Sequence, residues 1–291
     1  MTEKELAWQS KLVLLVVMPF AGAGVVLQTH WWATQMMPVA IWTVGMSLLL
    51  GLVTWKLRAA TPWGALAGTA ITASLMFSTV TFPYWPWHTA LMPVLAVALL
   101  AFVVTLLGRG KKERLGTAED RRGRSASQVA ANLGVAALVS NAFIQNWFVD
   151  SQWFTRTTAS PVLIFSVALA ALAEAAADTA SSEVGQAFGG RPRMITTLRA
   201  VEPGSNGAVS LTGTVAGVVA AAIVATAGTL ALGGDRTMFA ISCAGGFFGL
   251  LFDSMLGATL EERGWLNNDA VNFLSTGSAA GFALALLALR S

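Results

Sequence analysis

The sequence is poor in charged residues, cysteine and histidine. Asp, Glu, Lys and Arg make up only 11% of its 291 residues, whereas about a quarter of a soluble protein is charged. The one cysteine, Cys243, excludes an intrachain disulfide framework and a cysteine-rich metal site. The two histidines, His30 and His88, stand beside tryptophans in predicted outer segments. A serine–histidine or cysteine–histidine catalytic pair is therefore excluded.

Standard nucleotide-binding motifs are also missing. No glycine-rich loop ends in Gly-Lys-Ser or Gly-Lys-Thr. Gly22 and Gly24 lack the third glycine and the preceding strand of a dinucleotide-binding turn. Any phosphoryl chemistry in this chain would therefore use a different, membrane-embedded type of site.

Apolar residues are abundant instead: they make up 55% of the chain, and the mean hydropathy is +0.64. A helix needs about 20 residues to cross a bilayer. We expect an all-α, polytopic membrane protein with about nine transmembrane helices, over residues 12–27, 39–55, 63–82, 91–107, 129–148, 161–177, 211–232, 238–256 and 271–289. The first run lacks a small-residue cleavage site, which predicts a signal-anchor helix. Residues 1–107 would form an N-terminal four-helix membrane region and residues 108–291 a catalytic membrane region.

The basic residues predict the orientation of these helices. With the N-terminus inside and nine spans, all of the 18 Lys and Arg residues except Arg156, Arg236 and Arg290 fall on the inner side. Cytoplasmic loops carry such an excess, so we expect the N-terminus inside and the C-terminus outside. In a bacterial cell this membrane would be the inner (plasma) membrane. The polar clusters described below would then all lie on its cytoplasmic face.

The first polar cluster occupies residues 174–213. Glu174 and Asp178 are four residues apart at the end of an alanine-rich apolar run, and Glu183 follows. Two uncompensated carboxylates at this spacing would repel, and Mg²⁺ commonly binds one or two carboxylates together with substrate phosphates. A break in the helix after Asp178 could turn Glu183 back toward it. An ordinary charged loop is the alternative, but it would not explain Asp178 at the end of an apolar run, where charge is costly.

Arginines and a small-residue turn follow within the same cluster: Arg191, Arg193 and Arg199, then Pro203-Gly204-Ser205-Asn206-Gly207, then Ser210. Backbone N–H groups in such a turn, leading to a helix start, can bind an anion. Pro-Gly and Asn-Gly are common in ordinary turns, so the neighbouring arginines make this signal stronger than the turn alone.

A second cluster surrounds Asp253. Gly245, Gly249, Asp253 and Gly257 are four residues apart and share one helix face, which Ser254 flanks. Glycines on a membrane helix usually indicate close packing. An aspartate in the same stripe needs a partner, and a site shared with Asp178 or a metal would supply one.

Asparagines and one basic loop complete the polar residues. Asn267 or Asn268 could cap the last helix, whereas Asn272 lies one turn inside it. Arg124, Gln128 and Asn132 follow the basic loop 108–127 at four-residue intervals and would share one helix face. This stripe either lines a site or makes hydrogen bonds between helices.

These motifs resemble those of a known integral-membrane family, which contains transmembrane protein 19 and the plant phytyl-phosphate kinase of tocopherol synthesis. The resemblance is specific over residues 173–277 and weaker over residues 124–132. The matching segments are Asp178-Thr179, Ser182-Glu183-Val184-Gly185, Arg193 with Ile195-Thr196-Thr197, Pro203 to Gly207, Ser210 to Thr214, Asp253 to Ala258 and Asn268 to Phe273. Ala180-Ser181 departs from it, since many relatives carry a bulkier residue there.

The resemblance implies a kinase that converts a polyprenyl monophosphate to the diphosphate, with CTP or another nucleoside triphosphate as donor. Mg²⁺ would bind Asp178, Glu183 and Asp253, and Arg193 would act on phosphate charge. The expected substrate-binding residues are Arg124, Gln128, Asn132, Arg191, Gly204, Ser205, Asn206, Gly207, Ser210, Ser254, Asn268, Asp269 and Asn272. The prenyl tail would enter between the alanine-rich run 161–177 and the glycine-rich run 238–256.

The expected partners are the lipid bilayer, a polyprenyl phosphate and a nucleotide, without nucleic acid, and a homo-oligomer is left open. A transporter or flippase is the alternative, in which Asp178 and Asp253 would bind a proton or cation near the bilayer midplane. A non-catalytic membrane scaffold is a further alternative, which the intramembrane carboxylates argue against.

Overall fold

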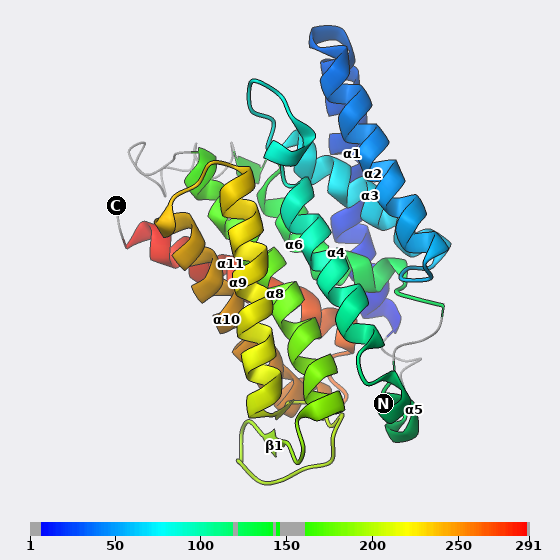
Figure 1. Ribbon diagram of the computed structural model, residues 1–291, viewed down its shortest axis with the longest axis vertical. Coiled ribbons are helices and arrows are strands. Elements are labelled where there is room, and N and C mark those ends of the chain that lie inside the picture. Colours follow the sequence, from blue (N-terminus) through cyan, green and yellow to red (C-terminus); the bar gives the residue numbers. More distant parts are fainter. Residues whose placement is uncertain (1–6, 119–121, 142–143, 146–160, 290–291) are drawn as a thin grey trace.

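The chain forms a bundle of helices with one short two-stranded sheet (Figure 1). The computed structural model describes residues 7–118, 122–141, 144–145 and 161–289, and the side chains only from residue 165 onward in the last of these ranges. The termini and residues 119–121, 142–143 and 146–160 lie outside the described residues, and so does the end of the predicted span 129–148.

The N-terminal helices are α1 (Ala7–Gln35), α2 (Met37–Lys56) and α3 (Pro62–Phe77). The turn η1 (Pro86–His88) leads to α4 (Leu91–Leu106). α3 begins at Pro62 because the side chain of Thr61 accepts a hydrogen bond from the backbone of Gly64 (3.1 Å), which satisfies one free amide of the first turn.

A sharp bend separates α4 from α5 (Arg109–Leu115), which meet at 67°. Gly108 makes this bend with φ +62°, a backbone conformation that glycine adopts without strain. α6 (Ala126–Val139) starts with a capping box, in which Ser125 and Gln128 bond each other's backbone amides.

The centre of the bundle is α8 (Pro161–Phe188), and α9 (Leu211–Ala231), α10 (Arg236–Leu256) and α11 (Asn268–Ala288) surround it. Its buried alanines allow these helices to approach closely. A Cβ at Gly246 of α10 would lie 2.9 Å from that of Ala173, and one at Gly217 of α9 would lie 2.9 Å from the Ala177 carbonyl oxygen. The glycines of α10 therefore serve packing, as their spacing predicted.

Irregular segments join these helices. The strands β1 (Arg193–Met194) and β2 (Ala208–Val209) pair antiparallel between α8 and α9. Asp235 caps α10 by accepting the Met238 amide proton (3.0 Å), and this bond lowers the pKa of the Asp235 carboxyl. At its other end α10 continues into the π-turn η2 (Gly257–Glu261).

The all-α membrane class is confirmed, but the predicted number of spans is not. Each of the nine predicted ranges overlaps a helix, although 63–82 and 129–148 extend beyond the ends of α3 and α6. Within the described residues, five helices are long and apolar enough to cross a membrane, or six if the bent pair α4–α5 is one span. α3 and α6 are shorter, with 16 and 14 described residues, and α8 ends at Phe188 rather than at Ala177.

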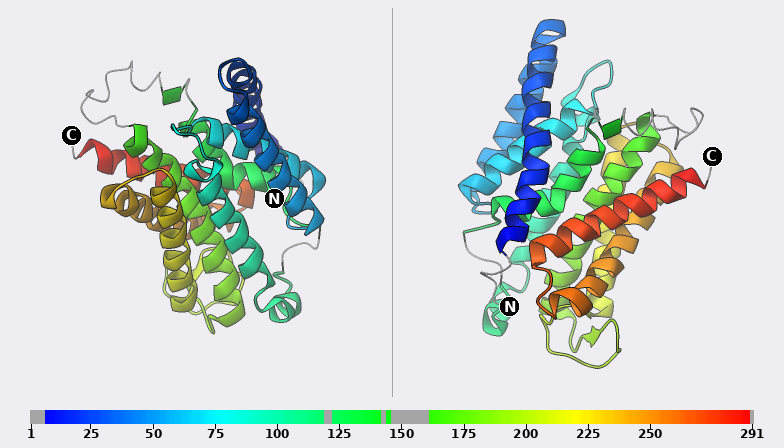
Figure 2. Two further views of the ribbon diagram at one scale, coloured as in Figure 1. Left: turned by 45° about the horizontal axis from the view of Figure 1, so that its top comes forward. Right: turned by 180° about the vertical axis from the view of Figure 1, so that it is seen from behind.

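The loops predicted to be cytoplasmic gather at one end of the bundle. Gln9 of α1 bonds the backbone of Trp265 and Asn267 before α11, at 2.9 and 2.8 Å, and Figure 2 shows these two helix ends side by side. β1, η2 and α5 lie toward the same end (Figure 1). The shared location of these loops agrees with the orientation predicted from charge, while the sidedness of the protein stays a prediction.

Candidate functional site

A polar cavity of about 450 Å³ opens at this loop-bearing end, between α6, α8, α10, α11 and the segment before α9. Most of the predicted site residues line it: Arg124, Gln128, Asn132, Asp178, Glu183, Gly204, Ser205, Asn206, Gly207, Ser210, Asp253, Ser254, Asn268 and Asn272. The tertiary structure thus brings together residues from four separate motifs.

Asp178 and Asp253 form the acidic centre of this cavity. Asp178 lies within α8 and Asp253 within the last turn of α10, and both side chains line this cavity. Glu174, one turn below Asp178, is buried against Gly249 of the same face of α10. Among the described residues, Asp253 Oδ2 and Glu174 Oε1 are buried without a hydrogen-bond partner. Such oxygens call for a proton or cation.

Glu183 has a different environment from the other two predicted metal ligands. α8 is unbroken between Asp178 and Glu183, so the break that could have turned Glu183 toward Asp178 is not present. One Glu183 oxygen accepts the hydroxyl of Thr105 (3.1 Å), and the other binds the ammonium of Lys112. The carboxylate therefore joins α8 to α4 and α5.

Arg124 supplies a positive charge at the acidic centre. Its guanidinium interacts electrostatically with Asp178 and donates to the Thr179 hydroxyl (3.4 Å). Its backbone is held by two bonds to the loop before α3, with Ala59 (3.0 Å) and Thr61 (2.9 Å). A side chain at Gly64 would collide with the Arg124 carbonyl oxygen. The position of Arg124 is thus fixed by contacts on both sides of its backbone.

The turn 203–207 lines the cavity. Gly207 has φ +73°, and a Cβ there would collide with Ala258 at the start of η2. A Cβ added at Gly204 would likewise collide with the Thr117 side chain. The backbone amides of Ser205 and Ala208 bond within the turn, to Glu202 and Ser205 oxygens at 3.2 and 3.1 Å. Close backbone approach therefore places this turn between α5 and η2.

Several other predicted residues line the cavity but also have local structural partners. Ser210 caps α9 by accepting the Gly213 amide proton (3.1 Å). The Asn132 side chain donates to the Gln128 carbonyl within α6 (2.8 Å). Asn267 is the cap of α11, which leaves Asn268 and Asn272 as the asparagines that line the cavity.

Three predicted site residues lie outside the cavity lining: Arg191, Arg193 and Asp269. Arg193 is exposed in β1, and its guanidinium donates to the Leu198 carbonyl (2.8 Å). Asp269 is buried and accepts the Ser10 hydroxyl (2.6 Å), so it fastens α11 to α1. Motif spacing could not predict that Arg193 and Asp269 lie outside the cavity lining. The sequence around a loop arginine or a helix-start aspartate is the same whether its side chain faces a site or another helix.

Sequence reasoning missed several residues at the site. Thr117, Thr179, Gln186 and Glu261 line the cavity, and Lys112 binds Glu183 behind it. Lys112 was one of many basic residues in a loop, where the default interpretation is an orientation signal. No signal in the sequence separated it from Lys111, whose ammonium binds the Ala187 carbonyl (2.9 Å).

The donor set is suited to a hard cation that takes oxygen ligands. Mg²⁺ uses one or two carboxylates and completes its shell with water and phosphate oxygens. Asp178 and Asp253 provide two carboxyl groups that line the same cavity, and Asp253 Oδ2 is buried without a protein partner. No three Asp, Glu, His or Cys side chains are arranged to hold a metal within the described part of the chain. The residues present therefore fit Mg²⁺ only together with a phosphate ligand.

Comparison with known proteins establishes the family. Residues 45–280 match the family described as integral membrane protein DUF92. The chain belongs to this family. The family expected from the motifs is thereby confirmed. No solved structure matches the DUF92 chain.

Three relatives of this DUF92 protein illustrate its range. An uncharacterized membrane protein of Methanocaldococcus jannaschii is 43% identical over 108 residues, 37% of this chain and 45% of that protein. An uncharacterized membrane protein of Synechocystis is 34% identical over 199 residues, 66% of this chain and 72% of that protein. Protein VTE6, chloroplastic, of Arabidopsis thaliana is 28% identical over 215 residues, 72% of this chain and 62% of that protein. The alignments thus span less than two thirds of the archaeal and plant relatives.

Proposed function

We propose that this DUF92 protein is a membrane-embedded kinase that transfers the terminal phosphoryl group of a nucleoside triphosphate to a polyprenyl monophosphate. The observation that carries the proposal is the convergence of Asp178, Asp253 and Arg124 in one polar cavity at the loop-bearing end of the bundle. The resemblance of its motifs to the plant phytyl-phosphate kinase supports the same reaction. CTP is the proposed donor, and the cytoplasmic face of the bacterial inner membrane is the proposed location.

The reaction needs little covalent chemistry from the protein. A non-bridging oxygen of the prenyl monophosphate forms a bond to the terminal phosphorus of the nucleotide. The bond from that phosphorus to the bridging oxygen breaks, and its electron pair leaves with the nucleoside diphosphate. Since the acceptor is already an anion, no general base is required. Catalysis then depends on position and on neutralising charge.

The cavity residues have distinct proposed roles in this reaction. Arg124 binds phosphate oxygens and is held in place by its backbone bonds to Ala59 and Thr61. Asp178 and Asp253 hold Mg²⁺, which when bound supplies a Lewis acid that neutralises phosphate charge. Glu183 is a positioning residue that holds α4 and α5 against α8.

The turn 203–207 and the amides of Asn268 and Asn272 complete the proposed polar pocket. Ser205 and Asn206 face the phosphates from the turn, while the two asparagines contact the nucleotide or the acceptor head. Gln128 and Asn132 contribute from α6, on the side of Arg124. The side-chain amides of these asparagines and of Gln128, together with the Ser205 hydroxyl, offer both donors and acceptors. Such a set suits a ligand with phosphate and base groups.

The direct test uses purified protein in nanodiscs with Mg²⁺ and terminally labelled CTP, GTP, UTP or ATP. Prenyl monophosphates of graded length serve as acceptors. We expect label in the prenyl diphosphate, and none with the Asp253→Asn variant. Absence of diphosphate from every donor and acceptor would overturn the kinase. Movement of a prenyl phosphate across the bilayer without nucleotide would instead support the transporter.

A further inference from the structure

A second cavity, of about 400 Å³, adjoins the polar one between α2, α3, α4 and α6. Its size is within the range of about 300–1,000 Å³ that holds small ligands. Apolar side chains dominate its deeper part, among them Leu50, Val94, Val97 and Leu133. A cavity of this kind binds a hydrocarbon more favourably than it binds water.

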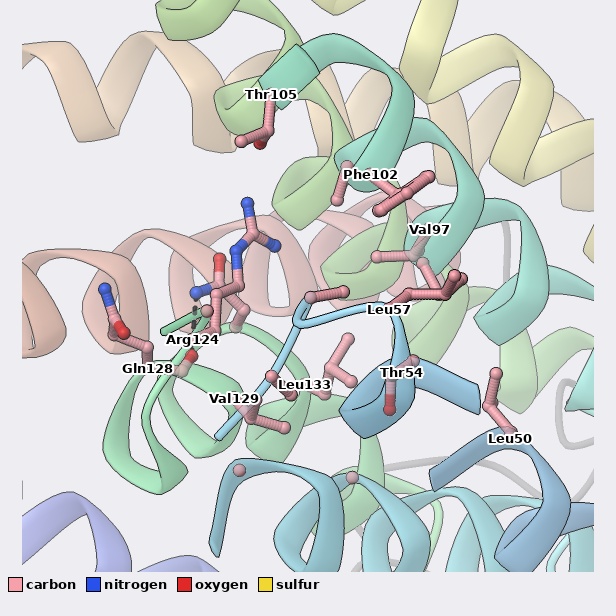
Figure 3. A pocket seen from close by; sticks show the side chains of 18 of the residues that line it. Leu50, Thr54, Leu57, Val97, Phe102, Thr105, Arg124, Gln128, Val129 and Leu133 are labelled. Atoms are coloured by element: carbon pink, nitrogen blue, oxygen red, sulfur yellow. Dashed lines mark hydrogen bonds between the residues drawn. The ribbon is translucent and has the colours of Figure 1, made fainter. Parts of the chain in front are cut away.

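Three residues belong to both cavities: Arg124, Gln128 and Asn132. Figure 3 shows the Arg124 guanidinium at the lining of the apolar cavity, pointing toward Thr105 of α4 and away from Leu57 and Leu133. Asp178 and Thr179, whose hydroxyl accepts a bond from Arg124, line the polar cavity together with these shared residues. A ligand that fits both cavities therefore has an anionic group at Arg124 and an apolar remainder.

The apolar cavity also reaches the surface of the bundle. Leu57 after α2 and Leu106 at the end of α4 line it and are 54% and 50% exposed. Arg58 and Arg109 line the same rim. Along α4 the lining runs from Val94 to Leu106, about 18 Å at roughly 1.5 Å per residue. The cavity thus combines an apolar depth with a rim of cationic residues.

We propose that this cavity binds the hydrocarbon tail of the prenyl monophosphate, with its phosphate at Arg124; the inference rests on the proposed function. The tail then lies between α2, α3, α4 and α6, and not between α8 and α10 as the sequence suggested. Close packing fills the latter space, since a Cβ at Gly245 would lie 2.7 Å from that of Ala170. The volume of the cavity limits the prenyl chain length that the enzyme accepts.

The test fills the cavity from two different helices. Ala98→Phe places a ring in it from α4, and Gly68→Leu fills it from α3, where the nearest atom to a new Cβ is Val129 Cγ1 at 3.7 Å. The matched control is Leu99→Phe, whose side chain is the next on α4, does not line the cavity and is 64% exposed. Each variant is assayed in nanodiscs with geranyl, farnesyl, geranylgeranyl and phytyl monophosphate.

We expect both filled variants to raise KM for the longest acceptors, relative to geranyl monophosphate, by roughly 10- to 200-fold, the range that one methylene of misfit produces in an apolar pocket. Leu99→Phe should keep the wild-type profile. If the wild type is active and neither filled variant changes the profile, the tail does not bind here, although the kinase stands. Use of two helices guards against a variant that does not fold.

A binding measurement separates failure of this inference from failure of the kinase. Phytyl monophosphate should raise the unfolding temperature of the wild type and of Leu99→Phe, but not of Ala98→Phe, while inorganic phosphate should affect all three equally. This pattern in an inactive wild type would support the tail site and reject the kinase. Equal stabilisation of all three by phytyl monophosphate would reject the tail site. If phytyl monophosphate stabilises none of the three proteins, the tail site is also rejected. Phospholipid acyl chains would then be the better occupant of the cavity.

Discussion

Lys112 of α5 and Glu183 of α8 form a buried ion pair. Lys112 is 0% exposed, and its ammonium also donates to the carbonyls of Val104 (3.2 Å) and Thr105 (2.8 Å) at the end of α4. The same lysine therefore satisfies carbonyls left free at a helix end and joins three helices. The bend between α4 and α5 makes this possible, because it folds Lys112 back onto the end of α4.

Lys112→Met should lower the free energy of unfolding by roughly 3–5 kcal/mol, because it leaves the Glu183 charge buried and unpaired. Lys112→Met with Glu183→Leu should recover most of that loss, since an apolar pair often replaces a buried ion pair at little cost. Denaturant unfolding in micelles measures both. Glu113→Gln is the control: it breaks the more exposed pair with Arg109 (3.1 Å) and should cost under about 1 kcal/mol. Wild-type stability of Lys112→Met would contradict this account.

Asp253→Asn should abolish phosphoryl transfer with little change in stability, because its carboxylate is proposed to bind metal rather than protein. Asp178→Asn should do the same. Asp269→Asn is the contrasting variant: it weakens the bond from Ser10 and should cost roughly 1.5–3 kcal/mol, as charged hydrogen bonds do, while folded molecules keep their turnover. Labelled product per folded molecule, together with unfolding curves, distinguishes these cases. Full turnover in Asp253→Asn would remove Asp253 from the site.

Arg124→Lys should slow transfer by roughly 10³–10⁵-fold, as loss of an arginine at a transferring phosphoryl group does, since an ammonium lacks the planar fork of donors. Arg193→Lys should stay within a few-fold of wild type, because Arg193 is exposed in β1 and outside the cavity lining. Single-turnover rates with saturating nucleotide give the comparison. Equal losses in the two variants would return Arg193 to the phosphate site predicted from sequence.

Gly207→Ala should disturb the turn over the cavity. Alanine at φ +73° costs about 1–2 kcal/mol, and its Cβ would collide with Ala258. We expect a lower unfolding temperature and a higher KM for nucleotide. Gly277→Ala is the matched control, because no atom lies within 4 Å of the Cβ it adds. A normal KM in a destabilised Gly207→Ala protein would show that the turn serves only the fold.

The orientation is tested with single cysteines. After Cys243→Ala, a cysteine at exposed Glu202 should react with an impermeant maleimide only in inside-out vesicles, and one at exposed Arg236 only in intact cells. The basis is the excess of basic residues in the segments that meet near the polar cavity. Labelling of the Glu202 position from outside would reverse the predicted topology and place the proposed site away from cytoplasmic nucleotide.

The sequence alone was enough to establish the all-α membrane class and to single out most of the residues that line the polar cavity. Long apolar runs can only become helices in a membrane, since every backbone polar group must be satisfied internally there. All nine predicted ranges accordingly overlap helices. Charge inside such runs is costly, which is why Asp178 and Asp253 stood out and now line one cavity.

Which polar side chains meet depends on how the helices pack. Helical spacing gives the face on which a residue lies but not the neighbour of that face, so Glu183 was grouped with Asp178 although it binds Lys112 of α5. For the same reason Asp269 was assigned to substrate although it bonds Ser10 of α1. The apolar cavity beside Arg124 depends on how four helices, α2, α3, α4 and α6, pack against one another. Their packing sets its volume, which no local pattern of residues records.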